Sequence, residues 1–199
     1  MSYSQFSLAS ALNTFGLTLK EQPFLPDIPP VQPSELLSAY LNETIPVVSI
    51  TGSEKARSEG IIYPVLTEVR RCLNRRVSIF SGEEFTVDSG AGLNGVCDFI
   101  ISRSPTQLLI QAPVVMMAEA KKADLSQGLG QCAAEMVAAQ RFNDAAQAAI
   151  TTIYGCVTSG TQWLFLQLQG QTLTVDPAEY ALPPAAPVLG CLIWMVEQG

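Results

Sequence analysis

The chain has 199 residues, 48% of them hydrophobic and 15% charged, and a formal net charge of -7. This composition is typical of one globular domain with a hydrophobic core, and it excludes a disordered or low-complexity protein. The chain contains no histidine, which excludes Ser-His-Asp and Cys-His nucleophilic sites and HExxH zinc sites. Any chemistry must therefore use carboxylates and lysine, with or without a metal.

The sequence shows no targeting or membrane signal. No apolar run approaches the roughly 20 residues that a membrane-spanning helix needs. The first 19 residues contain no lysine or arginine, unlike a secretory signal or a transit peptide. We therefore expect a cytoplasmic protein with no membrane partner. The five cysteines are odd in number and form no CxxC pair, which predicts buried free thiols rather than disulfides or a zinc site.

The first 50 residues are expected to form a helical arm that packs on the main domain. Amphipathic segments at 7–17 and 34–41 predict two helices, and the proline-rich segment 22–33 between them cannot be a continuous helix. Residues 51–199 are expected to form the core of the same single domain.

The central part of the chain predicts a helix followed by strands. Residues 53–73 carry an apolar stripe at helical spacing, which predicts a helix that kinks or restarts at Pro64. Short segments rich in β-branched or aromatic residues follow, and they predict a β-meander. These segments are residues 77–80, 83–88, 95–102 and 113–121.

The second half predicts a small-residue-rich helix at 126–149, strands at 152–160 and 161–176, and a C-terminal helix at 187–198. This order of elements predicts an α/β domain with a mixed β-sheet flanked by helices. The segment GAGLNG at 90–95 matches the GxGxxG dinucleotide fingerprint, but a strand rather than a helix follows it. We therefore interpret it as a hairpin turn.

Three charged residues near predicted strand ends predict a catalytic site. Glu119 and Lys121 are two residues apart in a strand, so their side chains project to the same face. Asp98 lies within the apolar segment VCDFIIS, where an unpaired carboxylate is costly. If the two strands are antiparallel neighbours, Asp98 and Glu119 meet at one end of the sheet. Two carboxylates beside an ammonium group fit Mg²⁺ binding and phosphoryl chemistry.

This order of residues resembles the PD-(D/E)XK nuclease superfamily, which has the restriction-endonuclease-like fold. The residues that carry the resemblance are Glu68 in the first helix, Asp98 in one strand, Glu119-Ala120-Lys121 at the end of the next, and Gln131 in the following helix. The resemblance covers about residues 53–170. Segments 53–71 and 92–105 also resemble an uncharacterised bacterial branch of this superfamily.

The resemblance implies a nuclease that uses Mg²⁺ or Mn²⁺ to hydrolyse phosphodiester bonds of DNA or RNA. It implies that Asp98, Glu119 and the backbone carbonyl of Ala120 bind the metal. It also implies that Lys121 is the catalytic lysine and that Glu68 adds a ligand directly or through water.

Gln131 matches a glutamine that contacts the catalytic site in some branches of the family. The sequence departs from the family pattern at two positions, because Cys97 replaces a proline and Glu135 replaces an aromatic residue. Other roles remain open for two of the residues. Glu68 could pair with Arg71 along its helix, and Gln131 could form a hydrogen bond at a helix interface.

The alternative function is a catalytically silent nuclease-fold module for binding or assembly. Ten of the eleven Lys and Arg residues and nine of the 18 acidic residues lie between residues 55 and 141, so this part best tolerates nucleic acid. The acidic remainder, and the lack of a basic and aromatic stretch, favour the module. A third interpretation is a homo-oligomer that pairs through the apolar segment CLIWMV at 191–196.

Overall fold

The computed structural model describes residues 1–199 apart from the side chain of Thr51. The strands are β1 (Thr18–Glu21), β2 (Ser78–Glu84), β3 (Val96–Ser102), β4 (Val114–Ala120), β5 (Thr152–Thr158), β6 (Gln162–Gln169) and β7 (Thr172–Ala181). The α-helices are α1 (Leu8–Phe15), α2 (Glu35–Thr51), α3 (Glu54–Arg57), α4 (Tyr63–Cys72), α5 (Leu129–Ala145) and α6 (Ala185–Gln198). Short 3₁₀ segments are η1 (Tyr3–Gln5), η3 (Ser89–Ala91) and η4 (Leu125–Gly128), and the π-helical segment η2 (Ser58–Ile62) joins α3 to α4.

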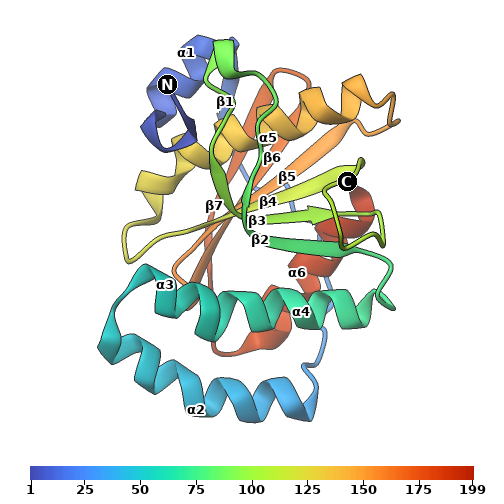
Figure 1. Ribbon diagram of the computed structural model, residues 1–199. Coiled ribbons are helices and arrows are strands. Elements are labelled where there is room, and N and C mark those ends of the chain that lie inside the picture. Colours follow the sequence, from blue (N-terminus) through green and yellow to red (C-terminus); the bar gives the residue numbers. More distant parts are fainter.

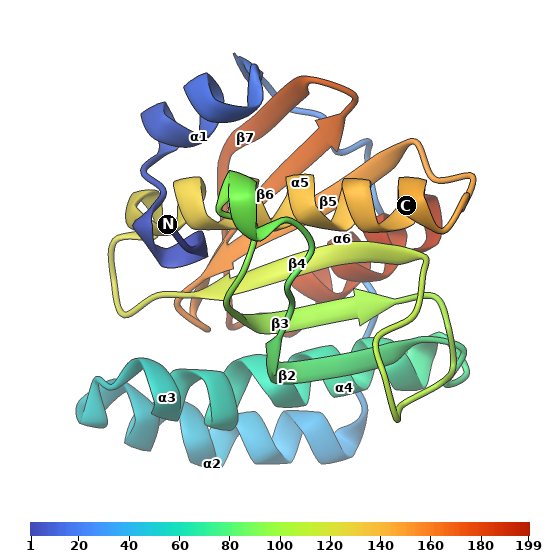
Figure 2. The same cartoon turned by 45° about the horizontal axis from the view of Figure 1, so that its top comes forward.

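A seven-stranded mixed sheet in the order β1-β7-β6-β5-β4-β3-β2 forms the centre of the molecule. Helices α1 and α5 lie on one side of the sheet, and α4 and α6 lie on the other, with α2 outside α4 (Figures 1 and 2). The predicted α/β class is therefore confirmed. Within the described residues, no helix is long and apolar enough to cross a membrane.

The predicted meander is formed by β2, β3 and β4, which pair in antiparallel order. Phe99 is opposite Ala118 in the β3–β4 register, so the next residues outward are Asp98 and Glu119. Helix α5 then carries the chain across the sheet to β5, which is parallel to β4. Parallel neighbours require such a crossover connection. The register therefore places both predicted metal-binding acids at the same end of the sheet.

The N-terminal arm differs in part from the prediction. Residues 18–21 are not helical or irregular but form β1, which pairs in parallel with β7 at the edge of the sheet. This strand has only four residues and is mostly exposed, so the apolar alternation that identifies longer strands is missing. The expected separate strand at 83–88 is also wrong, because its first two residues belong to β2 and the rest is irregular.

The arm packs on the core through its first residues. Tyr3 and Phe6 are buried, and the Tyr3 hydroxyl donates a hydrogen bond of 2.7 Å to the carbonyl of Phe85. The GAGLNG segment lies beneath them as a turn between β2 and β3, as predicted. Gly92 has a positive φ of 81°, and a Cβ there would lie 3.2 Å from the Phe6 ring. Glycine is therefore required both by the backbone and by the packing.

The C-terminal apolar segment is part of the hydrophobic core. On α6, Val188, Leu189, Leu192 and Met195 are completely buried. The segment CLIWMV, on which the homo-oligomer interpretation rested, therefore packs mostly into the core of its own chain. All five cysteines are free thiols, as predicted, and four of them are buried.

The close contact between α5 and the arm gives a test of the packing. A Cβ at Gly130 would lie 2.2 Å from the carbonyl carbon of Ser7 and 2.4 Å from the oxygen of Phe6. Backbone atoms cannot rotate away, so we expect Gly130→Ala to lower the free energy of unfolding by about 2 kcal/mol or more in urea titrations. The control Gly90→Ala, whose Cβ would lie 3.4 Å from Asp88, should change it by less than about 0.5 kcal/mol. Equal effects would contradict the packing.

Candidate functional site

The adjoining ends of β3 and β4 bring together Asp98, Glu119 and Lys121. One carboxylate oxygen of Asp98 accepts a hydrogen bond of 2.8 Å from the backbone N–H of Ala120. The Lys121 ammonium forms an ion pair with Oε1 of Glu119. The backbone N–H of Lys121 donates to the carbonyl of Thr158 on β5, which fixes the end of β4. The predicted meeting of the two acids and the lysine is therefore present in the structure.

Helix α5 adds two further side chains to this cluster. The amide nitrogen of Gln131 donates to Oε2 of Glu119 at 2.8 Å and to Oε1 of Glu135 at 3.1 Å. Both carboxylate oxygens of Glu119 are therefore hydrogen-bonded within the chain. Gln131 was predicted from the sequence, whereas Glu135 was noted only as a departure from the family pattern. A glutamate in the run of small and apolar residues QCAAEMVAA could have identified it as a buried acid.

Burial and like charge act together on the two glutamates. Glu119 is 1% exposed and Glu135 is completely buried. Burial, followed by the charge of Asp98, raises the pKa of Glu119, and these effects outweigh the opposing influence of Lys121. Burial, followed by the charge of Glu119, raises the pKa of Glu135 well above its usual value. Oε2 of Glu135 has no hydrogen-bond partner among the described residues.

A fourth acid, Glu54, approaches the cluster from the start of α3. Its charge contributes to the raised pKa of Glu119. Glu54 and Asp98 line a hollow of about 360 Å³ between α3 and the β2–β3 edge, together with Ser58 and Gly82. Glu54 was not identified from the sequence, because it lies at the N-terminal end of a long predicted helix whose orientation was unknown. The hollow gives access to one side of the Asp98 carboxylate.

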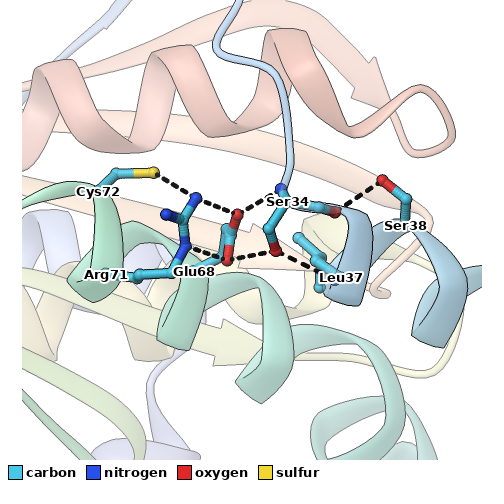
Figure 3. A network of polar contacts seen from close by, with 6 residues as sticks. All are labelled: Ser34, Leu37, Ser38, Glu68, Arg71 and Cys72. Atoms are coloured by element: carbon cyan, nitrogen blue, oxygen red, sulfur yellow. Dashed lines mark hydrogen bonds and ion pairs between the residues drawn. The ribbon is translucent and has the colours of Figure 1, made fainter.

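The structure does not bring Glu68 to this site. Its two carboxylate oxygens accept hydrogen bonds from Ser34 N at 2.6 Å and Ser34 Oγ at 3.1 Å. They also accept a bidentate pair of bonds from Arg71, at 2.9 Å from Nε and 2.7 Å from Nη2. Figure 3 shows this network at the N-terminus of α2, where Ser34 also accepts a bond from Leu37 N. Glu68 therefore holds α2 against α4.

The direction of α4 explains why the expected role of Glu68 is wrong. Glu68 lies in the second half of α4, which is followed by β2. The first residue of β2, Ser78, is opposite Ser102, whereas Asp98 lies at the other end of β3. Glu68 is therefore placed toward the end of the strands that is remote from Asp98. Its alternative role as the partner of Arg71 is the one observed.

Asp98, Glu119, Glu135 and Glu54 together form what we call the acid cluster. Its geometry is closer to that of a site for a hydrated hard cation than to that of an enclosed metal site. Within the described part of the chain, no three acidic or cysteine side chains converge closely enough to enclose a metal ion. Asp98 and Glu119 provide two carboxylates, and Mg²⁺ commonly uses one or two carboxylates together with water. Carboxyl groups outnumber ammonium groups in the cluster, and one buried oxygen of Glu135 has no partner among the described residues. The cluster must therefore retain protons or receive a cation.

If a divalent cation binds here, Asp98 and Glu119 are the carboxylates that would hold it, beside Lys121 and at the rim of the hollow that Asp98 lines. Such a set of groups is suited to the hydrolysis of a phosphate ester. Comparison of the chain with protein-family models, curated proteins and solved structures finds no match. The function must therefore be argued from the site itself.

The network of Glu68 predicts a stability effect that depends on pH. The hydrogen bonds from Arg71 lower the pKa of Glu68 below its usual value of 4.5. Its stabilisation is therefore complete above that value and is lost as the pH falls through the lowered pKa. We expect Glu68→Gln to lower the free energy of unfolding by about 2 kcal/mol at pH 7 and by much less near pH 3. Urea titrations at the two pH values measure this difference.

The exposed ion pair of Glu59 with Lys55 offers a matched control for that variant. Glu59→Gln should change the free energy of unfolding at pH 7 by less than about 1 kcal/mol. If Glu68→Gln has an effect equally small, the network does not hold α2 in place.

Glu135 predicts the opposite dependence on pH. Its pKa is raised in the folded protein, so above pH 4.5 the unfolded chain loses this proton while the folded chain retains it. Wild-type stability therefore falls relative to a glutamine variant as the pH rises. We expect Glu135→Gln to raise Tm more at pH 8 than at pH 5, by about 3 °C or more in calorimetry. The same Tm difference at both pH values would contradict a buried, protonated Glu135.

Proposed function

We propose that the protein is a Mg²⁺-dependent or Mn²⁺-dependent nuclease with a restriction-endonuclease-like fold, which hydrolyses phosphodiester bonds of DNA or RNA. The observation that carries this proposal is the convergence of Asp98, Glu119 and Lys121 at the ends of β3 and β4. The order of helix α4, the β2–β3–β4 meander, helix α5 and the parallel strand β5 supports it. This order places the three residues in the sequence of elements that the PD-(D/E)XK resemblance implies.

Asp98 and Glu119 are the side chains that would hold the metal, with the carbonyl of Ala120 as a further oxygen ligand. A metal bound there would polarise the scissile phosphate and lower the pKa of an attacking water. Lys121 provides a positive charge that orients this water and stabilises the charge that develops on the phosphate. Burial lowers the pKa of Lys121, but the charge and the hydrogen bond of Glu119, together with the charges of Glu54 and Asp98, outweigh it and raise the pKa. The ammonium group of Lys121 is therefore protonated at neutral pH.

Gln131 and Glu135 orient the metal-binding acid. The amide of Gln131 is held between the two glutamates, so its nitrogen faces Glu119 and its rotation is restricted. Glu54 takes the place that the sequence assigned to Glu68, because it is an acid in the helical segment before β2 whose charge reaches Glu119 and Lys121. An acid at this position can contact a hydrated metal through water.

A second candidate function is a catalytically silent module with the same fold. The observation that favours it is that Glu119 has no free carboxylate oxygen: its two oxygens are bonded to Lys121 and Gln131, and the residue is 1% exposed. Such a cluster is internally satisfied without a metal, apart from one oxygen of Glu135. In this case the cluster would serve to fix α5 on the sheet rather than to perform chemistry.

Substitutions at two adjacent lysines distinguish the nuclease from the catalytically silent module. Lys121 is paired with Glu119, whereas the neighbouring Lys122 is exposed and forms no ion pair among the described residues. We expect Lys121→Ala to lower the cleavage rate of mixed DNA and RNA substrates with Mn²⁺ by about 100-fold or more. Lys122→Ala should retain wild-type cleavage.

Binding of the metal is measured separately by the change in Tm on adding Mn²⁺. This increase should persist in Lys121→Ala, since removal of an ammonium group leaves the carboxylates in place, and it should disappear in Asp98→Asn. If Lys121→Ala cleaves as fast as the wild type, the nuclease assignment is wrong. If wild-type Tm does not respond to millimolar Mn²⁺ and no substrate is cleaved, the silent module is supported.

A further inference from the structure

Four arginines gather at the end of the molecule opposite the acid cluster. Nε of Arg70 donates to the carbonyl of Val77, and Nε of Arg76 donates to that of Leu73. These bonds, and one from Arg103 to the carbonyl of Glu197, place the arginines around the end of α4, the start of β2 and the end of α6. The arginine cluster, as we name it, comprises Arg70, Arg75, Arg76 and Arg103. Across the described residues, none of its members forms an ion pair with an acid.

The arginine cluster borders a hollow at this end of the fold. Arg76 and Arg103 line a cavity of about 530 Å³. Its apolar walls are Leu73, Val77, Pro113 and Val196, and Glu197 is the one acid that lines it. Each guanidinium has five N–H donors, and the bonds to backbone carbonyls occupy only one donor in each of these two arginines. Most donors of the cluster therefore remain available to an anion.

The turn that carries Arg75 is strained. Asn74 and Arg75 follow α4 with positive φ values of 53° and 59°. A residue with a side chain rarely adopts this conformation, and glycine would adopt it without strain. Arg75 is also exposed to solvent, so packing does not explain its side chain. Strain of this kind at an exposed position points to a use for the guanidinium.

The hollow beside the candidate catalytic site cannot hold a polyanion by itself. It is lined by Glu54, Glu59 and Asp98, with Lys55 as its only basic residue among the described residues. Lys55 is already paired with Glu59. A nucleic acid bound in this hollow would therefore need phosphate contacts elsewhere, because binding depends on cationic groups that replace its counterions.

We propose that the arginine cluster binds the phosphate backbone of the nucleic acid segment that flanks the cleavage site. This inference rests on the proposed nuclease function. Arg103 follows Asp98 by five residues along β3, which corresponds to roughly 16 Å or about five base pairs of a duplex. Figures 1 and 2 show the two regions at opposite ends of the same strands, with the end of α4 and the C-terminus on the right and the end of β4 on the left.

Arginines at a helix C-terminus can have a purely structural role, in which their charge stabilises the helix by interacting with its dipole. Substitution of Arg75 distinguishes phosphate binding from helix stabilisation, because the backbone of Arg75 is strained. Arg75→Gly relieves the strain and should raise Tm, whereas a purely structural arginine that stabilised the helix would lower Tm when removed. Under our proposal the same variant binds nucleic acid more weakly. A gain in stability together with a loss of affinity is the expected signature.

The test uses fluorescence anisotropy of a labelled 20-nucleotide single-stranded DNA with the full chain carrying Asp98→Asn, which prevents cleavage. Arg75→Gly and Arg103→Ala, each added to this variant, should weaken binding. Each should also make the negative slope of log affinity against log salt less steep by about 0.7. Arg141→Ala is the control, since Arg141 is paired with Asp88, and it should change neither quantity. Unchanged affinity and slope in both cluster variants would overturn the proposal, as would the absence of any binding.

Failure of this proposal can be distinguished from failure of the nuclease assignment. Binding that depends on the cluster, in a protein that cleaves no substrate with Mn²⁺, would support the cluster and reject the nuclease. Cleavage by the wild type with an unchanged KM in both cluster variants would support the nuclease and reject the cluster.

Discussion

The burial of more carboxylate than ammonium charge at the end of β4 is the constraint on which the site depends. Glu119 and Glu135 are almost completely buried, yet only Lys121 pairs with either of them among the described residues. Gln131 lies between the two acids and bonds to both. An uncompensated buried charge is costly, so the cluster must retain protons or receive a cation. This requirement links the packing of α5 on the sheet to the proposed chemistry.

The strands that bring the acidic residues together also separate them from the arginine cluster. Asp98 is the third residue of β3, and Arg103 directly follows its end. The chain has a net charge of -7, but four unpaired arginines lie together at the end remote from Asp98. The antiparallel register of β2 and β3 keeps the two regions apart. A nucleic acid that spans both regions would meet cationic contacts at one end and the cleavage site at the other.

Much of this arrangement could be predicted from the sequence, because strand alternation and pairing are local rules. The positions of Asp98, Glu119 and Lys121 followed from period-two alternation and an antiparallel neighbour. The role of Glu68 was wrong, since the direction of α4 relative to the sheet is a tertiary property that helical periodicity does not contain. Glu54 was missed for the same reason. Strand β1 has only four mostly exposed residues, so its pairing with β7 left no apolar pattern to find.

The central claim is that Asp98 and Glu119 form a cation site from which Lys121 can be released. The most direct measurement is a crystal structure with Mn²⁺, in which anomalous scattering locates the metal. We predict an anomalous peak in contact with carboxylate oxygens of both acids, with the Lys121 ammonium displaced from Oε1 of Glu119. Crystals soaked in Mn²⁺ that show no peak at this site, and that retain the bond between Lys121 and Glu119, would contradict it.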